Sequence, residues 1–206
     1  NMTIMFNGQL HGPLHAALTT KPEVVISGDA SLAALFKGSG MRTKIVEGEA
    51  AAWGKLLVNL ANAVLALTLK TFKDLFTDPD LRFVYTAVLD EAAHVLDGAG
   101  HAFKLPSPLP YRASRWLLRH GGPLPWWQAK FKNGVGDGTY PSMVADVRAG
   151  RKTEVDQLNG EIVRLGEQHG IPAPLNREIV RRIHALEGAV SPLYLQAAEL
   201  RRQLLA

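Results

Sequence analysis

The stretch from Trp53 to Leu67 places three polar side chains in an otherwise apolar helical pattern. Lys55, Asn59 and Asn62 stand at positions i, i+4 and i+7, so an α-helix aligns them along one face. An unpartnered polar group costs a few kcal/mol in a core, and an unpaired charge costs more. The stripe therefore faces a ligand cavity, a partner helix or water, and spacing alone leaves these alternatives open. In a cavity, an ammonium group could polarise a ketone and protonate the alkoxide that forms.

A second set of candidate residues lies further along the chain. Ser142 follows a proline and precedes an amphipathic run, which is typical of a helix N-cap that could hold an anion. Thr153 and Asp156 have the spacing of a capping box, which would place Glu154 in the first helical turn, where backbone dipoles favour its charged form. Taken alone, Ser142 and Glu154 are better explained as ordinary capping and first-turn residues than as site residues.

Other motifs give no support for nucleotide or metal binding. The glycine pairs at 38/40, 98/100, 134/136 and 136/138 all lack the third glycine of a dinucleotide fingerprint. The seven histidines have no ligand spacing and the chain has no cysteine, so we expect no metal site and no disulfide. Trp126 and Trp127 are interpreted as packing or interface anchors.

Composition indicates an ordinary soluble chain. Of its 206 residues, 47% are hydrophobic and 20% are charged, and the net charge of +4 argues only weakly for nucleic acid. The longest uncharged apolar run, Leu56 to Leu69, is shorter than the ~20 residues that a membrane span requires. No signal peptide is visible. We therefore expect a cytoplasmic protein with no nucleic-acid or membrane partner.

Hydrophobic periodicity predicts a mainly α fold with two parts. Residues 1–46 contain short predicted strands at 2–6, 24–26 and 42–46 and a short helix at 31–36, an α/β layer too small for a core of its own. Residues 47–206 form a predicted helical domain. Its expected helices span 47–68, 80–98, 108–119, 141–149, 153–169, 174–187 and 191–205, with a long loop at 121–141.

Two blocks of sequence together carry a resemblance. WGKLLVNLANA and PSMVADVRAGRKTEVDQLNGEIVRLGEQHGIPAP resemble the C-terminal domain of ketopantoate reductases, the NADPH-dependent 2-dehydropantoate 2-reductases. The similarity covers residues 47 to 187 and implies a helical bundle of the 6-phosphogluconate-dehydrogenase-like type, often dimerising through this half. Residues 1–46 resemble the end of the family's Rossmann-like domain, without its glycine-rich turn. The implied reaction reduces 2-dehydropantoate to pantoate, a precursor of coenzyme A.

The resemblance also implies roles for individual residues. Lys55 matches the lysine that acts as general acid toward the C2 oxygen of the substrate. Asn59 matches a substrate-binding asparagine, and Ser142 matches a serine that helps to hold the substrate at its carboxylate end. Glu154 matches a glutamate that orients the lysine or hydrogen-bonds the cofactor or substrate. NADPH is the implied cofactor, and a homodimer is the implied assembly.

Two features separate this chain from the commoner family pattern, and one is the loop before Ser142, which reads Gly138-Thr139-Tyr140 and lacks the asparagine that some relatives carry there. The other lies after Lys55. Many members place a second asparagine eight residues after the lysine, followed by proline, whereas this chain has Ala63 there and Asn62 one residue earlier. We therefore keep Asn62 as an expected substrate-binding residue and name the expected substrate only by its class, the 2-keto acids. We expect the substrate-binding half of a reductase, inactive without its nucleotide domain. The alternative is a stand-alone, non-catalytic ligand-binding or interaction protein that keeps the fold.

Overall fold

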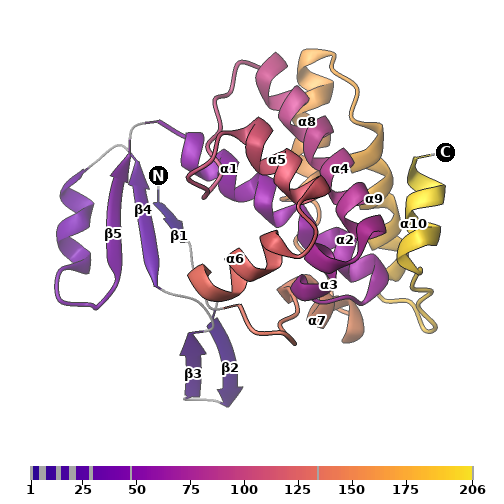
Figure 1. Ribbon diagram of the computed structural model, residues 1–206, viewed down its shortest axis with the longest axis horizontal. Coiled ribbons are helices and arrows are strands. Elements are labelled where there is room, and N and C mark those ends of the chain that lie inside the picture. The colour runs from indigo at the N-terminus through magenta and orange to yellow at the C-terminus, as the bar shows by residue number, and fades with distance from the viewer. Residues whose placement is uncertain are drawn as a thin grey trace.

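The computed structural model describes residues 2–4, 8–12, 15–18, 22–27, 30–46, 48–133 and 135–205. It contains a small α/β part and a larger helical part (Figure 1). The expectation of a mainly α fold is confirmed. The strands are β1 (Met2–Ile4), β2 (Gly8–Gly12), β3 (His15–Leu18), β4 (Glu23–Ser27) and β5 (Arg42–Val46). The helices are η1 (Ala30–Phe36), α1 (Ala50–Asn59), α2 (Ala61–Thr68), α3 (Phe72–Thr77), α4 (Pro79–Gly98), α5 (Tyr111–His120), α6 (Leu124–Asn133), α7 (Ser142–Arg148), α8 (Asn159–His169), α9 (Pro174–Leu186) and α10 (Ala197–Leu204).

The α/β part is a three-stranded sheet in the order β1-β4-β5. The central strand β4 runs antiparallel to β1 and parallel to β5, with Val25 opposite Lys44. Parallel strands need a crossover connection, which the 3-10 helix η1 supplies here. The three predicted strands and the short helix are present, although residues 5–6 of the first strand lie outside the described residues. The hairpin β2–β3 was not predicted.

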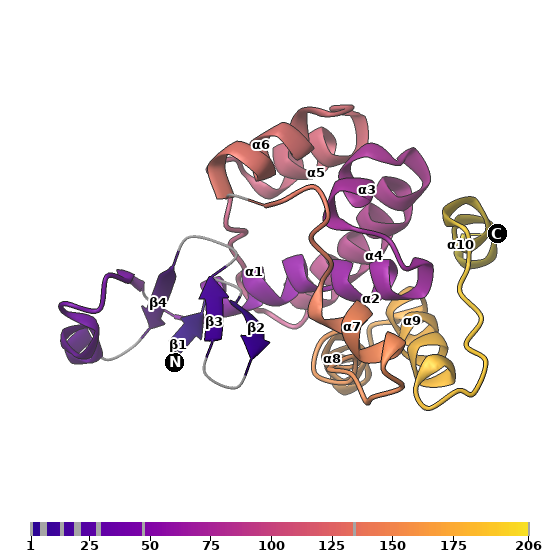
Figure 2. The same cartoon turned by 90° about the horizontal axis from the view of Figure 1, so that it is seen from below.

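Helices α1 and α2 form the centre of the helical part, with α5 and α6 to one side and α7 and α8 to the other (Figure 2). All eight residues of α2 are buried, and α7, α9 and α4 pack against it. Leu60 interrupts the ladder for one residue but keeps right-handed helical angles, so the predicted single helix continues through it. Length and hydropathy alone would let Ala50–Thr68 cross a membrane, a test that buried core helices of soluble proteins also pass.

Two helices were not predicted, and two others start later than predicted. Helix α6 lies inside the predicted loop. It forms because a proline in the first turn of a helix sacrifices no hydrogen bond. The prediction missed it because the prolines of this stretch were interpreted as loop signals. Helix α3 begins at an overlooked capping box of Thr71 and Asp74. Helix α10 starts six residues later than predicted, and the preceding segment instead donates the Leu195 N–H to the Leu67 carbonyl at 2.9 Å. Helix α8 starts at Asn159, since no capping box forms at Thr153.

A buried polar network ties α4, α8 and α9 together. Asn159 donates to the Asn176 side-chain oxygen at 3.0 Å, and both asparagines are fully buried. Asn176 donates in turn to the Glu91 carboxylate at 2.8 Å, and the same carboxylate accepts the backbone N–H groups of Leu175 and Asn176 at 2.8 Å each. Glu91 of α4 thereby satisfies N–H groups at the start of α9, which have no partner inside their own helix.

Removing the central amide of this network should destabilise the fold. Asn176→Ala is expected to lower the free energy of unfolding by about 2–3 kcal/mol, because it leaves the Asn159 amide without its acceptor inside the core. Urea denaturation followed by circular dichroism measures the change. The exposed Gln157→Ala serves as the control and should change it by less than about 0.5 kcal/mol. Equal effects of the two variants would contradict the assigned role of the network.

Candidate functional site

Lys55 and Asn59 lie one turn apart on α1, and both side chains are half-buried. A close approach at Gly54 fixes this helix: the Lys104 N–H donates to the Ala50 carbonyl at 2.8 Å, and a Cβ atom at Gly54 would lie 1.8 Å from the Lys104 oxygen. Only glycine allows the 104 backbone to pack this tightly against α1. The helix that carries Lys55 is therefore held against a defined neighbour.

Asn62 lies on α2, beyond the interruption at Leu60, and is only 8% exposed. Within the described part of the chain, the side chains of Asn59 and Asn62 have no hydrogen-bond partner. Half-buried and buried amides of this kind retain donors and acceptors for a ligand or water. The structure does not show Asn62 in contact with the other candidate residues, so its role as a substrate ligand stays a prediction.

Ser142 is the first residue of α7, and Pro141 occupies the N-cap position, so the prediction of Ser142 as N-cap was wrong. Instead, the Ser142 hydroxyl donates to the Glu154 carboxylate at 3.3 Å. Helix α7 packs against α2, which places this serine beside the central helices. A serine freed from capping has its hydroxyl available to a neighbouring side chain.

Glu154 does not stand in the first turn of a helix, which corrects that prediction. It belongs to a turn that precedes α8, in which the Gln157 N–H donates to the Glu154 carbonyl at 3.1 Å. The Thr153 hydroxyl accepts from the Val155 N–H at 3.2 Å and donates to the Glu187 carboxylate at 2.7 Å, so it is not free to cap α8. The turn projects the Glu154 side chain into solvent, next to Ser142.

Burial and charge act on Lys55 in opposite directions. Burial lowers the pKa of the Lys55 ammonium from its usual 10.5, and the carboxylate of Glu154 partly offsets this by attracting the charged form. A lowered pKa makes the ammonium a better proton donor, while the carboxylate helps to keep it charged. Three side chains therefore form one interacting group: Lys55 from α1, Ser142 from α7, and Glu154 from the turn that precedes α8.

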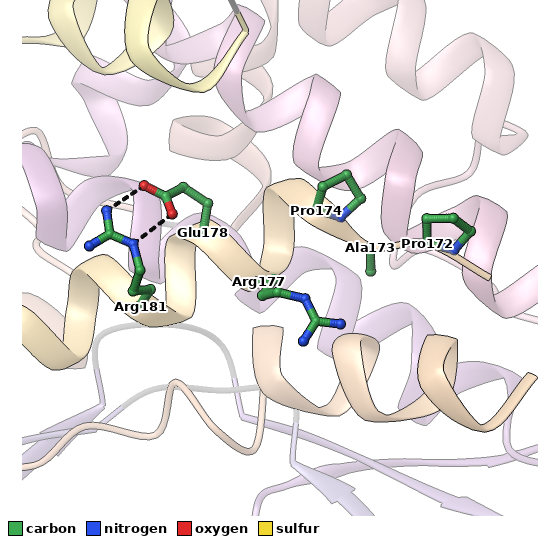
Figure 3. Close-up of a pocket in the computed structure, with 6 residues that line it drawn as sticks. All are labelled: Pro172, Ala173, Pro174, Arg177, Glu178 and Arg181. Carbon is green, nitrogen blue, oxygen red and sulfur yellow. Dashed lines mark hydrogen bonds and ion pairs between the residues drawn. The ribbon is translucent and has the colours of Figure 1, made fainter. Parts of the chain in front are cut away.

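Two surface hollows lie away from this group. The larger, of about 310 Å³, is lined by residues at the start of α9 (Figure 3). Its charges are already paired, since Arg181 contacts Glu178 at 2.6 Å and Arg177 contacts Glu167 at 2.9 Å. A second hollow of about 290 Å³ lies at the start of α1, around Trp53 and His101. Neither hollow includes Lys55. We therefore assign the candidate site from side-chain chemistry, which points to the group of Lys55, Glu154 and Ser142.

No metal centre accompanies the site in the described ranges. Among these residues, no group of three or more His, Cys, Asp or Glu side chains lies close enough together to hold a metal ion.

The contacts of Thr153 with Glu187 were not predicted from the sequence, because the two residues are 34 positions apart and no local pattern joins them.

Sequence comparisons relate the chain to reductases. The family model described as "Ketopantoate reductase PanE/ApbA C terminal" matches residues 48–187. The 2-dehydropantoate 2-reductase of Archaeoglobus fulgidus is 27% identical over 168 residues, covering 80% of this chain and 50% of that protein. The enzyme of the same description from Pyrobaculum aerophilum is 32% identical over 163 residues, covering 78% and 52%. The chain thus spans about half the length of the curated relatives it matches.

Structural comparisons agree with this relationship. A PanE/ApbA family ketopantoate reductase from Ralstonia eutropha JMP134 superposes with a TM-score of 0.69 at 26% identity, covering 90% of this chain and 58% of that one. D-mandelate dehydrogenase in complex with NADH (TM-score 0.73, coverage 92% and 62%) and dimeric ketopantoate reductase from Staphylococcus aureus (0.69, 90% and 61%) share the fold at 20% identity. With the family match extending from α1 through α9, this chain belongs to the ketopantoate reductase family, in the region of its C-terminal domain.

Proposed function

We propose that the chain forms the substrate-binding and proton-donating half of an NADPH-dependent reductase of a 2-keto acid, with 2-dehydropantoate as the leading substrate and pantoate as its product. The observation that supports this most directly is the Lys55 ammonium, whose pKa burial lowers and the Glu154 carboxylate partly restores. Membership in the ketopantoate reductase family supplies the reaction class.

The chain's own residues account for the proton side of the reaction. The cofactor of a complete enzyme would supply the hydride for C2 of the keto acid, and Lys55 would donate the proton to the carbonyl oxygen as its electron pair moves there. The product is a 2-hydroxy acid, and the neutral amine recovers its proton from water. Glu154 keeps the amine charged before transfer and orients it, while Ser142 and Asn59 hold the substrate.

The substrate is set partly by the corner near Asn62. The fully buried Ala63 stands where many relatives have a second asparagine, and Asn62 is nearly buried without a protein hydrogen-bond partner in the described residues. A ligand that displaces water from this amide would be favoured if it hydrogen-bonds Asn62 and disfavoured if it leaves the amide unpaired. We assign Asn62 to substrate binding and keep 2-keto acids as the class.

The dinucleotide itself does not fit the residues of this chain. Its phosphates need a glycine-rich turn between a strand and a helix. The sequence has no such fingerprint, and the crossover from β4 to β5 includes the seven-residue 3-10 helix η1. We therefore assign β1, β4 and β5 to the end of a nucleotide-binding domain, whose phosphate-binding residues are not among these 206. Glu154 remains the residue of this chain proposed to reach the cofactor.

We further propose that the protein is cytoplasmic and acts as a homodimer through its helical half. The fold likeness to the dimeric ketopantoate reductase from Staphylococcus aureus supports the assembly. Analytical ultracentrifugation of the chain measures it, and a mass of one chain over the micromolar range would argue against it.

Titration with NADPH tests the proposal that the residues that bind the cofactor phosphates are not among those of this chain. The 206-residue chain is expected to bind NADPH no tighter than about millimolar, because its sequence has no glycine-rich phosphate-binding fingerprint. Isothermal titration calorimetry gives the dissociation constant. A value well below millimolar would show that this chain holds the cofactor unaided and would overturn the proposal. Turnover by the chain alone would do the same.

Removing the Glu154 charge should lower the pKa of Lys55 further. The carboxylate favours the ammonium, so Glu154→Gln is expected to move the Lys55 titration to lower pH, and proton donation would fail at correspondingly lower pH. Titration of the Lys55 side-chain carbon by NMR measures the shift in this chain. Glu167→Gln, at an exposed glutamate of α8, is the matched control and should leave Lys55 unchanged. A Lys55 titration that stays in place or rises in Glu154→Gln would refute the pairing.

A further inference from the structure

His184, near the end of α9, joins two carboxylates that sit on different segments. Its Nδ1 atom lies 2.8 Å from Glu187 Oε2 on its own segment, and its Nε2 atom lies 2.9 Å from Asp156 Oδ1 in the turn before α8. Those two carboxylates are the charged groups that act on the ring in the described part of the chain. The imidazole therefore bridges the end of α9 to the turn that carries Glu154.

Hydrogen-bond chemistry defines the protonation state that this bridge needs. An ionised carboxylate only accepts hydrogen bonds, and a neutral imidazole donates from one ring nitrogen only. Both contacts are satisfied together when both ring nitrogens carry a proton. In keeping with this, the hydrogen bond to Glu187, followed by that to Asp156, outweighs partial burial and raises the pKa of His184 above its usual 6.5.

The same carboxylates hold both sides of Glu154. Glu187 Oε1 accepts the Thr153 N–H at 2.8 Å and the Thr153 hydroxyl at 2.7 Å, and Asp156 lies two residues after Glu154. The Glu154 side chain between these anchors accepts from Ser142 at 3.3 Å and acts on Lys55. The position of the Glu154 carboxylate thus depends on a turn that is anchored to α9 at its two ends.

We propose that His184, protonated on both ring nitrogens, is a positioning residue that clamps the 153–156 turn to α9 and so sets the place of the Glu154 carboxylate beside Ser142. The contribution to the candidate site rests on the function proposed above for Glu154. Because the protonated form holds the clamp, the bridge is complete below the usual pKa and is lost as pH rises through the raised pKa of the folded protein. The contact of His184 with Asp156 is the one that breaks at high pH, because the Asp156 side chain is 60% exposed to water and the Glu187 side chain only 12%.

An NMR titration of the 206-residue chain, from about pH 5 to pH 9, tests the clamp without any need for turnover. The His184 ring is expected to titrate above its usual pKa. The amides of Thr153 and Val155, the side-chain carboxyl carbon of Glu154 and the Ser142 amide should all shift with the same midpoint. A Glu154 carbon that does not follow the His184 midpoint would overturn the positioning role, even if the clamp itself titrates.

Three variants separate the clamp from general effects of pH. In His184→Gln the shared midpoint should vanish and the turn amides should keep their high-pH positions throughout. In His184→Lys, which keeps its charge over this range, those amides should stay near their low-pH positions. His169→Gln, at another exposed helix-end histidine, is the control and should retain the wild-type titration. A shared midpoint that persists in His184→Gln would refute the proposal, whereas an active Lys55→Ala enzyme would refute the proposed function and leave this titration intact.

Discussion

Lys55→Ala is expected to lower kcat by about 10²–10⁴-fold in an enzyme completed with a nucleotide-binding domain, because a positioned general acid contributes a factor of that size. The half-buried ammonium has a lowered pKa and is placed by α1 beside Glu154. Alanine would remove the proposed proton donor and leave the substrate carbonyl without a cation.

The measurement joins this chain to the part of the Archaeoglobus fulgidus 2-dehydropantoate 2-reductase that it does not match, and follows NADPH absorbance with 2-dehydropantoate. Lys70→Ala is the matched control: Lys70 is also half-buried, but it lies just after α2, and it should leave kcat within about twofold because it is outside the proposed machinery. KM should change less than kcat in Lys55→Ala, since the amides and Ser142 remain. Near-normal turnover in Lys55→Ala would rule out Lys55 as the proton donor.

The second large effect is structural and is expected at Gly54→Ala. The added Cβ would lie 1.8 Å from the Lys104 carbonyl oxygen and 2.4 Å from its carbon, and both are backbone atoms that cannot rotate away. Overpacking of this kind costs about 3 kcal/mol, which for a chain of this size lowers Tm by roughly 6–12 °C. Calorimetry with denaturant melts measures the loss in the free energy of unfolding.

Gly160→Ala supplies an internal comparison of opposite sign. A Cβ at Gly160 in α8 would meet its nearest neighbour at 3.5 Å, an ordinary contact, and alanine is the better helix former by about 0.5–1 kcal/mol. That variant should be neutral or slightly more stable. A stable Gly54→Ala protein would mean that the segment around Lys104 does not pack against α1, and the stated environment of Lys55 would then be wrong.

Agreement between sequence and structure is best where local rules decide the outcome. Helix α4 begins at an Asp78 N-cap followed by Pro79, and helix α9 begins at Pro174, so the starts were readable within one residue. Agreement fails where a distant group takes a local donor or acceptor. Thr153 has the spacing of a capping residue, yet Glu187 captures its hydroxyl, and α8 starts six residues later.

The candidate site shows the same difference between what local spacing predicts and what distant contacts decide. Spacing alone placed Lys55 and Asn59 on one helical face, and the two sequence blocks indicated the family that the comparisons confirm. Spacing did not indicate that Ser142 donates to Glu154 instead of capping α7. The division of residues 1–46 from the helical domain, with Glu47 outside the described residues, stays a prediction.

The sequence by itself thus determined the helical character of the chain, the stripe of Lys55 and Asn59, and the membership in a reductase family, because periodicity and motif spacing are local properties. Only the tertiary structure decided which groups act on that stripe. Packing of α7 against α2 and the anchoring of the 153–156 turn to α9 bring Glu154 to Lys55 from about 100 positions away in the chain. Hydrogen bonds and charges act over a few ångströms, so their partners are set by packing and not by spacing along the sequence.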